Sequence, residues 1–173
     1  ERNLEDRVTV LKEDYRDLTG QYDKLVSIEM IEAVGERYWP QYFAMLKDRL
    51  AEGGRAVVQA ITVPDAYFDI YRKGSDYIRQ YTFPGGMLLS DAMIAHHAER
   101  AGLKVSDNFG FGLDYARTCR MWSERLSEAS DRVLRLGYDQ SFLRNWQFYL
   151  QICAASFETR QTDVVQVELQ HAT

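Results

Sequence analysis

Residues 22–35 read YDKLVSIEMIEAVG, and the rest of the predicted fold is organised around them. The apolar, partly β-branched run at residues 25–28 predicts a short buried strand. The sequence then becomes acidic, with Glu29 and Glu32 following the strand. In an open α/β sheet, ligands bind in the crevice beyond the carboxyl ends of the strands. The two carboxylates are therefore either loop residues that face water, as most acidic residues do, or residues of a site.

The composition is that of one globular domain. The 173 residues are 46% hydrophobic and 27% charged, which is enough apolar material for a substantial core. The formal net charge of -5 argues against broad nucleic-acid binding, because no domain-wide positive field would offset phosphate repulsion. No apolar run approaches the roughly 20 residues needed to span a bilayer. We therefore expect a soluble, cytoplasmic protein.

The cysteines and histidines do not predict a metal site. Cys119 and Cys153 lack Cys-x-x-Cys spacing, and we expect both to be small buried apolar residues in a reducing compartment. His96 and His97 are adjacent on a predicted helix, so their side chains point in different directions. We expect no bound metal ion.

Hydrophobic periodicity predicts strands that alternate with helices. The predicted strands are residues 8–11, 25–28, 56–61 and 163–170, with mixed strand and loop at 103–111; the predicted helices are residues 38–50, 90–101, 114–127 and 139–157. Ser90 is the expected N-cap of its helix and Gly102 the expected stop. The alternation at 163–170 fits a strand near a sheet edge. Together these elements predict an α/β fold with a mostly parallel sheet, right-handed βαβ connections and helices on both faces.

The segment 64–86 is longer than an ordinary sheet connection and rich in aromatic residues. Its aromatic residues are Tyr67, Phe68, Tyr71, Tyr77, Tyr81 and Phe83. Such a segment is either a lid or substrate wall, or a helical decoration of the core. Its basic residues Arg72, Lys73 and Arg79 either meet lipid phosphate or form a solvated charged face.

The chain opens almost directly on a predicted strand, without a glycine-rich phosphate or dinucleotide turn. Half of a nucleotide-binding fold is therefore absent from the sequence as given. We expect the chain to be the carboxyl-terminal part of a larger polypeptide, and to have no activity by itself.

Several separated segments resemble the cyclopropane fatty acid synthases, which are methyltransferases dependent on S-adenosylmethionine. The matching segments, in the order and spacing of that family, are residues 14–18 (DYRDL), 22–35, 58–65 (VQAITVPD), 81–86 (YTFPGG), 114–118 (DYART) and 164–167 (VVQV). The resemblance runs over nearly the whole chain. It implies a Rossmann-like methyltransferase fold with an antiparallel last strand, of which residues 1–173 supply the carboxyl-terminal part and residues 64–86 a helical substrate wall or lid.

The resemblance also implies an activity, the transfer of a methylene to a cis double bond of a phospholipid acyl chain. The alkene attacks the sulfonium methyl group, and the resulting carbocation loses a proton as the ring closes. A dry pocket with aromatic walls suits such a cation. The implied proton acceptor is a bound bicarbonate, held by Glu32, Gln59, Tyr115 and the backbone of Ile28.

Two site residues have alternative interpretations, and one departs from the family. The helical stripe that contains Tyr115 makes it a core tyrosine if taken alone, and Tyr15 is otherwise a loop aromatic that covers the core. Gln59 stands where many bacterial members carry His, although a plant-type branch carries Gln. An amide still donates a hydrogen bond, but it does not titrate near neutral pH. The bicarbonate-contacting cysteine of the family has no match in this sequence.

Further contacts follow from the same resemblance. The cofactor would lie against Asp14, Tyr15, Ser27 and Ile28, and the acyl chain against Tyr77, Tyr81, Phe83 and Gly85. The enzyme would work on the inner face of the membrane as a peripheral protein, without nucleic-acid partners. A homodimer is compatible with the sequence, which does not fix the oligomeric state.

Three other functions stay open at this point. The same carbocation would give a methyl-branched or methylene product if it lost a different proton. A methyltransferase of this fold could also act on a small soluble molecule, without lipid contact. The third alternative is a non-catalytic lipid-binding or oligomerisation domain.

Overall fold

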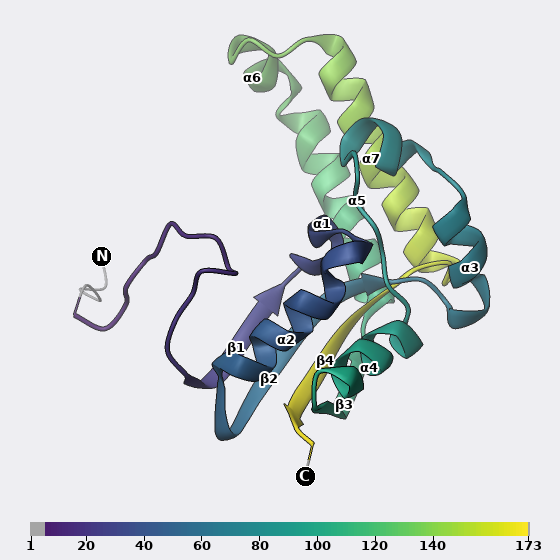
Figure 1. The fold of residues 1–173 in the computed structure, drawn as a ribbon. Helices are drawn as coiled ribbons and strands as arrows, with labels where there is room; N and C mark the ends of the chain where they lie inside the picture. The colour runs from purple at the N-terminus through teal and green to yellow at the C-terminus, as the bar shows by residue number, and fades with distance from the viewer. Residues whose placement is uncertain (1–5, 173) are drawn as a thin grey trace.

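The computed structural model describes residues 6–172, which form a four-stranded sheet with helices on both faces (Figure 1). The strands are β1 (Tyr22–Ile28), β2 (Leu50–Thr62), β3 (Leu103–Gly110) and β4 (Asp163–His171), in the order β1-β2-β4-β3. β1 and β2 pair in parallel, whereas β4 is antiparallel to both of its neighbours. Three strands therefore run in one direction and the last runs against them, as predicted.

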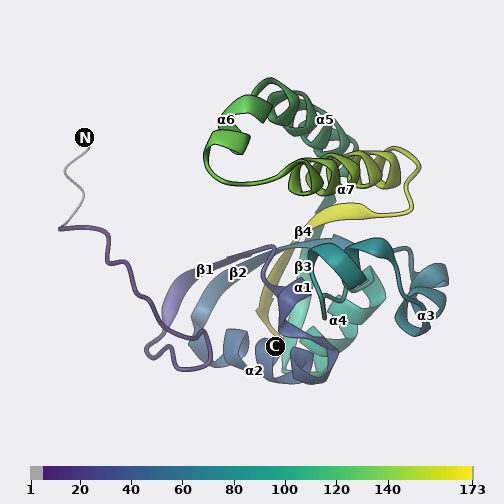
Figure 2. The ribbon, with the colours of Figure 1, turned by 90° about the horizontal axis from the view of Figure 1, so that it is seen from above.

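The helices form two layers, one on each side of the sheet (Figure 2). One side carries α2 (Trp39–Arg49) and α4 (Asp91–Arg100), which pack on β1, β2 and β3. The other side carries α5 (Gly112–Glu128) and α7 (Gln140–Glu158), which pack on each other and reach the sheet at β4. The shorter helices are α1 (Ile31–Val34), the 3-10 turn η1 (Glu36–Tyr38), α3 (Asp65–Lys73), the π-helical turn η2 (Ile78–Thr82) and α6 (Ser130–Arg135).

Side-chain alternation in the central strands separates two cores. Val58 of β2 and Val167 of β4 join α2 and α4 residues, including the fully buried Trp39 and Phe43, in the larger core. Residues of α5, α7 and β4 form a second core around Val164. Because successive strand residues face opposite sides, Gln59 and Gln166 lie on the α5–α7 side of the sheet.

Most of the predicted elements are confirmed, and their boundaries have visible causes. Ser90 Oγ accepts a hydrogen bond from the backbone N–H of Met93 at 3.4 Å, which makes Ser90 the N-cap of α4. The β1–α2–β2 unit is parallel, as expected. Segment 64–86 contains α3 and η2, although its role as a wall or lid stays a prediction.

Two sequence predictions are wrong. Residues 8–11 form no strand, and Val10 is 89% exposed, because a β-branched run becomes a strand only where a neighbour pairs with its backbone. The strand at 163–170 does not lie near an edge, since β4 sits between β2 and β3. Its alternation arises because its two faces are covered to different degrees: Val165, Val167 and Leu169 are buried in the larger core.

Gly53 and Gly54 lie inside β2, because α2 stops at Arg49 and β2 begins at the next residue. A Cβ atom on Gly54 would lie 2.9 Å from the carbonyl oxygen of Ala51 and 3.0 Å from that of Asp23. Glycine here therefore allows the close backbone approach at the start of the β1–β2 pair. No helix within residues 6–172 combines the length and apolar character needed to cross a membrane.

Candidate functional site

The site begins at Glu29, the residue that follows β1. Its φ is +48°, a left-handed conformation that non-glycine residues rarely adopt, and its backbone N–H donates to the carbonyl of Gln59 at 2.9 Å. The side chain of Glu29 accepts two hydrogen bonds at the same oxygen, Oε1. Gln59 Nε2 donates to it at 2.8 Å, and the hydroxyl of Tyr115 from α5 donates to it as well. Strained backbone that is held in place by several contacts is typical of functional sites.

The hydroxyl of Tyr115 is held in its protonated, donating form. Burial raises the pKa of Tyr115 above its usual range, and the hydrogen bond to Glu29 and the negative charge of Glu29 raise it further. Tyr115 also lies edge-on to Phe157 of α7 at a ring separation of 5.4 Å. It therefore packs in the second core and still donates to a carboxylate, so it belongs to both the core and the site.

A second glutamine extends this hydrogen-bond chain. Gln166 lies directly opposite Gln59 in the β2–β4 pair, and its Nε2 donates to Gln59 Oε1 at 2.9 Å. The chain therefore runs from Gln166 through Gln59 to Glu29. Both polar ends of the Gln59 amide have a partner.

Glu32 lies in the first turn of α1 and makes a different set of contacts. Its Oε1 accepts a hydrogen bond from the backbone N–H of Ile61 at 2.7 Å, whereas its Oε2 is buried without a hydrogen-bond partner. Burial raises the pKa of Glu32, the hydrogen bond from Ile61 opposes that change, and the charge of Glu29 adds to it. A buried oxygen without a partner is costly, and it is most readily satisfied by a ligand that donates a hydrogen bond.

Both carboxylates line a cavity of about 1540 Å³. Segment 76–88 and helix α7 supply much of its wall, including Tyr77, Phe83 and Tyr149. Phe83 lies edge-on to Tyr149 and to Trp146, at ring separations of 5.5 Å and 6.5 Å. This size and this aromatic, apolar lining suit a long apolar ligand better than a small polar one.

The predicted substrate residues divide into three that line the cavity and one that does not. Tyr77, Phe83 and Gly85 line it. The hydroxyl of Tyr77 donates to Asn145 Oδ1, and this bond joins the segment to α7. Gly85 adopts a φ of +85°, which favours glycine. Tyr81 packs on Tyr77 but is 66% exposed and is not part of the lining.

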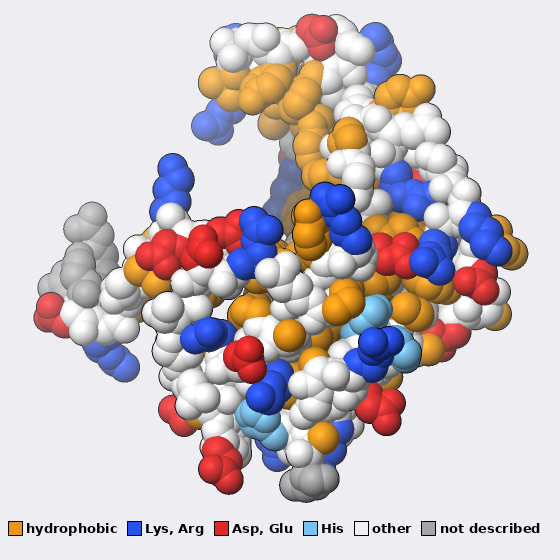
Figure 3. Space-filling view, viewed as in Figure 1, with side chains coloured by type: hydrophobic (Ala, Val, Ile, Leu, Met, Phe, Trp, Pro, Cys, Tyr) orange, Lys and Arg blue, Asp and Glu red, His pale blue; other side chains and the backbone are white. Residues whose placement is uncertain are grey.

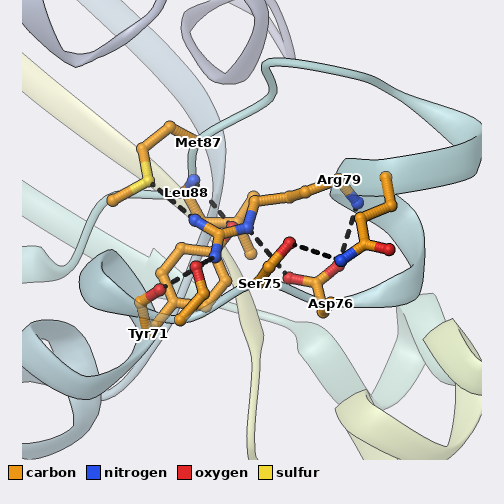
Figure 4. Close-up of polar contacts among 8 residues, drawn as sticks. Tyr71, Ser75, Asp76, Arg79, Met87 and Leu88 are labelled. Atoms are coloured by element: carbon orange, nitrogen blue, oxygen red, sulfur yellow. Dashed lines mark hydrogen bonds and ion pairs between the residues drawn. The ribbon is translucent and has the colours of Figure 1, made fainter.

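Arg79 holds this wall together from inside (Figure 4). Its guanidinium donates to Asp76 Oδ2 at 3.1 Å, to the carbonyl of Tyr71 at 3.1 Å and to the sulfur of Met87 at 3.4 Å, and it lies 4.5 Å from the ring centre of Tyr71. Only 14% of its side chain is exposed. Arg79 is therefore committed to internal partners, which is unlike the lipid-phosphate contact considered from the sequence. Arg72 pairs with Glu36 at 2.6 Å.

Two of the predicted cofactor residues, Tyr15 and Ser27, lie on the α2 side of β1, which is the side opposite this network. Tyr15 packs edge-on against Tyr42, with a ring separation of 6.0 Å, and the hydroxyl of Tyr42 donates to Ser27 Oγ at 2.7 Å. Tyr15 and Ser27 therefore contact the same buried tyrosine. Asp14 pairs with Arg16 at 2.6 Å. Ile28 is 62% exposed, and the backbone N–H that reaches Glu32 belongs to Ile61.

The two cysteines are free thiols on facing helices. Cys119 is buried, and Cys153 lines the cavity, where burial raises its pKa to about 12. At neutral pH both are therefore thiols rather than nucleophilic thiolates. Within residues 6–172, no three His, Cys, Asp or Glu side chains are grouped closely enough to hold a metal ion.

Apolar side chains also gather on the helical arm made by α5, α6 and α7, at the top of the space-filling view (Figure 3). The exposed large apolar residues between α5 and the start of α7 include Met121, Trp122, Leu136 and Tyr138, each between 41% and 70% exposed.

The sequence does not assign three contributors to the site. It places Glu29 at the end of a strand without a specific role, and it gives no signal for Ile61 or Gln166. Position directly after a predicted strand was the available signal for Glu29. The roles of Ile61 and Gln166 depend on which strand residues lie opposite one another, and register is not readable from a single sequence.

The chain is similar in sequence to proteins that are named as lipid-modifying enzymes. A family model described as mycolic acid cyclopropane synthetase matches residues 1–167. The tuberculostearic acid methyltransferase UfaA1 of Mycobacterium tuberculosis is 43% identical over 154 residues, which cover 88% of this chain and 36% of that protein. The cyclopropane-fatty-acyl-phospholipid synthase of Escherichia coli K12 is 33% identical over 160 residues, which cover 92% of this chain and 40% of that protein. The chain thus spans less than half the length of these relatives.

Solved structures support the fold. The cyclopropane synthase MmaA2 of Mycobacterium tuberculosis superposes with a TM-score of 0.83 at 21% identity, over 95% of this chain and 62% of that one. The mycolic acid cyclopropane synthase CmaA1, in complex with SAH and CTAB, superposes with a TM-score of 0.81 at 24% identity, over 90% of this chain and 57% of that one. The fold is therefore the Rossmann-like methyltransferase fold that the sequence predicts.

Proposed function

Because the chain belongs to the mycolic acid cyclopropane synthetase family, we propose that it is part of an S-adenosylmethionine-dependent enzyme that modifies a cis double bond in a lipid acyl chain. One observation carries this proposal. Two carboxylates, Glu29 and Glu32, line an aromatic-walled cavity of about 1540 Å³, and a buried oxygen of Glu32 has no protein partner. Such a cavity suits an alkyl chain, and carboxylates within it suit the removal of a proton.

The walls would protect a positively charged substrate. When bound, S-adenosylmethionine would supply an electrophilic methyl group. Its transfer to the alkene would release S-adenosylhomocysteine and leave the positive charge on the acyl chain. The rings of Phe83 and Tyr149 would stabilise that charge through their electron-rich faces and exclude water that would quench it. The thiols of Cys119 and Cys153, held protonated, would not compete as nucleophiles.

Glu29 is the side chain best arranged to accept the proton. Two donors, Gln59 and Tyr115, bind its Oε1 and fix the orientation of its carboxylate. The product follows from which proton leaves. Loss of a proton from the transferred methyl carbon, with closure to the neighbouring cation, gives a cyclopropane ring. We take this as the first candidate product.

Bicarbonate is a second candidate for the acceptor, and its fit to this chain is partial. Its hydroxyl would satisfy Glu32 Oε2, the buried oxygen without a partner. The single O–H of Tyr115 would have to leave Glu29 before it could donate to the ion, whereas the NH₂ group of Gln59 has a second N–H to donate. Glu32 would accept a hydrogen bond from the hydroxyl of bicarbonate, and the bicarbonate ion would act as the base.

One observation favours a second product class, a methylene or methyl-branched chain. A fixed carboxylate such as Glu29 removes whichever proton lies nearest to it, and that proton need not be on the transferred methyl group. UfaA1, at 43% identity, is named as a methyltransferase rather than as a cyclopropane synthase. We therefore keep this product as the alternative.

The cofactor and membrane contacts are also proposals. We propose that Tyr15 and Ser27, joined through Tyr42, lie beside the cofactor together with Asp14 and Ile28. A phospholipid substrate implies work at the cytoplasmic face of the membrane, either as a monomer or as a homodimer. Binding to liposomes of anionic and neutral phospholipid tests the membrane contact, and it separates a lipid substrate from a small soluble one.

The central experiment expresses the full-length gene and analyses the cellular lipids by mass spectrometry. We expect the mass of each modified unsaturated chain to increase by one CH₂. Unchanged lipids would refute the proposal. Proton NMR of the same lipids separates the two products, because cyclopropane ring protons resonate far upfield of the protons of a methylene group on a double bond.

Variants of the full-length enzyme test the acceptor. Glu29→Gln and Glu32→Gln keep the shape of each side chain and remove its charge. We expect each to lower turnover at least about 10-fold while S-adenosylmethionine affinity changes less than about 2-fold. Equal losses of turnover and affinity would contradict the role. Activity that disappears in carbonate-free buffer, and returns with added bicarbonate, would favour bicarbonate over Glu29.

A further inference from the structure

The turn between α6 and α7, residues 136–139, lies at the outer end of the helical arm, away from the sheet (Figure 1). Two of its side chains are large, apolar and exposed: Leu136 at 70% and Tyr138 at 50%. Backbone hydrogen bonds hold the turn, since the N–H of Leu136 donates to the carbonyl of Arg132 at 3.2 Å and that of Gly137 to the carbonyl of Leu134 at 3.0 Å. The turn therefore presents both side chains to solvent from a fixed backbone.

A continuous series of ring contacts leads from this turn to the cavity. Tyr138 stacks on Phe142 at a ring separation of 4.2 Å, and Phe142 contacts Trp146 at 6.1 Å. Phe83 contacts Trp146 at 6.5 Å and Tyr149 at 5.5 Å. Phe83 and Tyr149 both line the cavity. We call these five rings the aromatic seam.

The seam suits the entry of an acyl chain. Residues 138–149 extend over about 16 Å, so the seam joins the end of the arm to the cavity across several turns of α7. A single exposed apolar side chain needs no explanation, but a contiguous apolar surface marks a place where another apolar body binds. An acyl chain that leaves a bilayer needs such a path, because exposure of its methylene groups to water is unfavourable.

The charges beside the turn complement lipid phosphate. Arg132 and Arg135 lie in the last turn of α6 and are exposed, and within residues 6–172 neither forms an ion pair. Asp131, in the first turn of α6, offsets part of their charge. Asp139 is already engaged, because its Oδ1 accepts a hydrogen bond from the backbone N–H of Phe142 at 2.7 Å and caps α7. Arginines beside exposed apolar side chains are typical of surfaces that bind phospholipid.

We propose that the α6–α7 turn inserts Leu136 and Tyr138 into the surface of a phospholipid bilayer, and that the aromatic seam leads the acyl chain from there to the cavity. The inference rests on the proposed function, in which the substrate is an acyl chain of a membrane lipid. It adds the face that touches the membrane and the route of entry. A second copy of this chain would cover the same surface but would also block the entrance to the seam.

Binding of the full-length protein to vesicles of phosphatidylcholine and phosphatidylglycerol tests the docking face. Leu136→Ser combined with Tyr138→Ser should weaken binding at least about 10-fold, because two apolar side chains no longer enter the interface. The matched control combines Ile70→Ser on α3 with Phe109→Ser on β3, at positions that are 63% and 61% exposed and lie outside the seam. It should change binding less than about 2-fold. Equal effects of the two double variants would overturn the proposal.

The arginines are tested on vesicles that differ in phosphatidylglycerol content. Arg135→Gln should reduce the extra binding to anionic vesicles about 5-fold. Arg100→Gln, in the last turn of α4, removes an equally exposed charge away from the arm and should leave that extra binding in place. Equal losses in both variants would contradict a specific contact of the turn with lipid phosphate.

Quenching by brominated phospholipid measures insertion directly. A tryptophan introduced by Leu136→Trp should be quenched on brominated vesicles, beyond the quenching of the parent protein, because it enters the interface. A tryptophan introduced by Phe109→Trp should add no quenching. Equal quenching at the two positions would overturn insertion of the turn.

Phe142→Ser tests the route, because it interrupts the seam between Tyr138 and Trp146 and keeps both apolar side chains of the turn. Vesicle binding should stay within about 2-fold, whereas kcat/KM for vesicle lipid should fall at least about 5-fold as the acyl chain loses its apolar path. A short-chain unsaturated phospholipid dissolved as monomers should show little change in kcat/KM. Equal losses with both lipids, or no loss with either, would overturn the seam as the route.

Two further outcomes are decided separately. Sedimentation of the parent and of the Leu136→Ser, Tyr138→Ser double variant gives their oligomeric states. A dimer that dissociates in the double variant would assign this surface to a second copy of the chain and overturn the proposal. If the parent forms no lipid product, the proposed function fails, whereas vesicle binding and quenching still decide the docking face.

Discussion

Gln59 on β2 donates a hydrogen bond of 2.8 Å to Glu29, the residue that follows the neighbouring strand β1. The two residues are 30 positions apart in the chain and meet because β1 and β2 pair in parallel, with Ile28 opposite Gln59. Parallel pairing brings the carboxyl ends of both strands to one edge, where ligands bind in such sheets. The pairing of β1 with β2 therefore determines the position of the Glu29 carboxylate, and contacts from the helices add to its fixation.

Removal of the Tyr115 hydroxyl tests the helical contribution. Tyr115→Phe keeps the ring packed against Phe157 but takes away one of the two donors to Glu29. A hydrogen bond to a charged group contributes about 1.5–3 kcal/mol, so we expect turnover to fall about 10- to 100-fold. Steady-state kinetics on lipid vesicles measure this. Tyr22→Phe, at a half-exposed position at the start of β1, is the control, and full activity in Tyr115→Phe would refute the role.

The fold was largely predictable because its signals are local. The helical stripe of α2 and the apolar run of β2 lie within single elements, and the Ser90 cap lies next to its helix. The errors both concern pairing. Residues 8–11 carry the composition of a strand but have no strand beside them within residues 6–172, and β4 carries an alternation that does not reveal its interior place.

The site was predictable only in part, for the same reason. Glu32, Gln59 and Tyr115 were named because they match the motifs of a family, and all three lie around one sheet edge. Their actual partners were not readable. Tyr115 meets Glu29 across 86 positions of the chain, and which of two nearby carboxylates it would choose depends on the turn after β1.

The buried carboxylate of Glu32 should make stability depend on pH. Burial raises its pKa above the ordinary 4.5, so the folded state binds this proton more tightly than the unfolded state does. Stability from this group is therefore greatest below about 4.5 and falls as pH rises from 4.5 through the raised pKa. Glu32→Gln should remove this fall. Urea unfolding of both proteins across that range measures it, and parallel curves would contradict the expected ionisation.

Phe83 tests the aromatic wall. Phe83→Leu keeps an apolar side chain but removes the ring that lies between Trp146 and Tyr149. If the ring faces stabilise a cation, kcat/KM should fall about 5- to 30-fold, which corresponds to about 1–2 kcal/mol, while cofactor affinity stays the same. Phe109→Leu removes a ring of β3 that is 61% exposed and lies outside the cavity lining, and it should change kcat/KM less than about 2-fold. Equal effects of the two changes would count against a cation beside Phe83.

Arg79 should matter through its geometry rather than its charge. Its planar group contacts Asp76, Met87 and the carbonyls of Tyr71 and Gly74 at once, and lysine cannot reproduce that fork. Arg79→Lys should therefore lower the free energy of unfolding by about 1–2 kcal/mol and raise the KM for lipid, because the cavity wall loosens. Arg72→Lys, at an exposed pair with Glu36, should change the free energy by less than about 0.5 kcal/mol. If Arg79→Lys and Arg72→Lys had the same small effect on the free energy of unfolding, Arg79 would contribute no more than an exposed ion pair. The cavity wall would then be held by the aromatic contacts between Phe83 and α7.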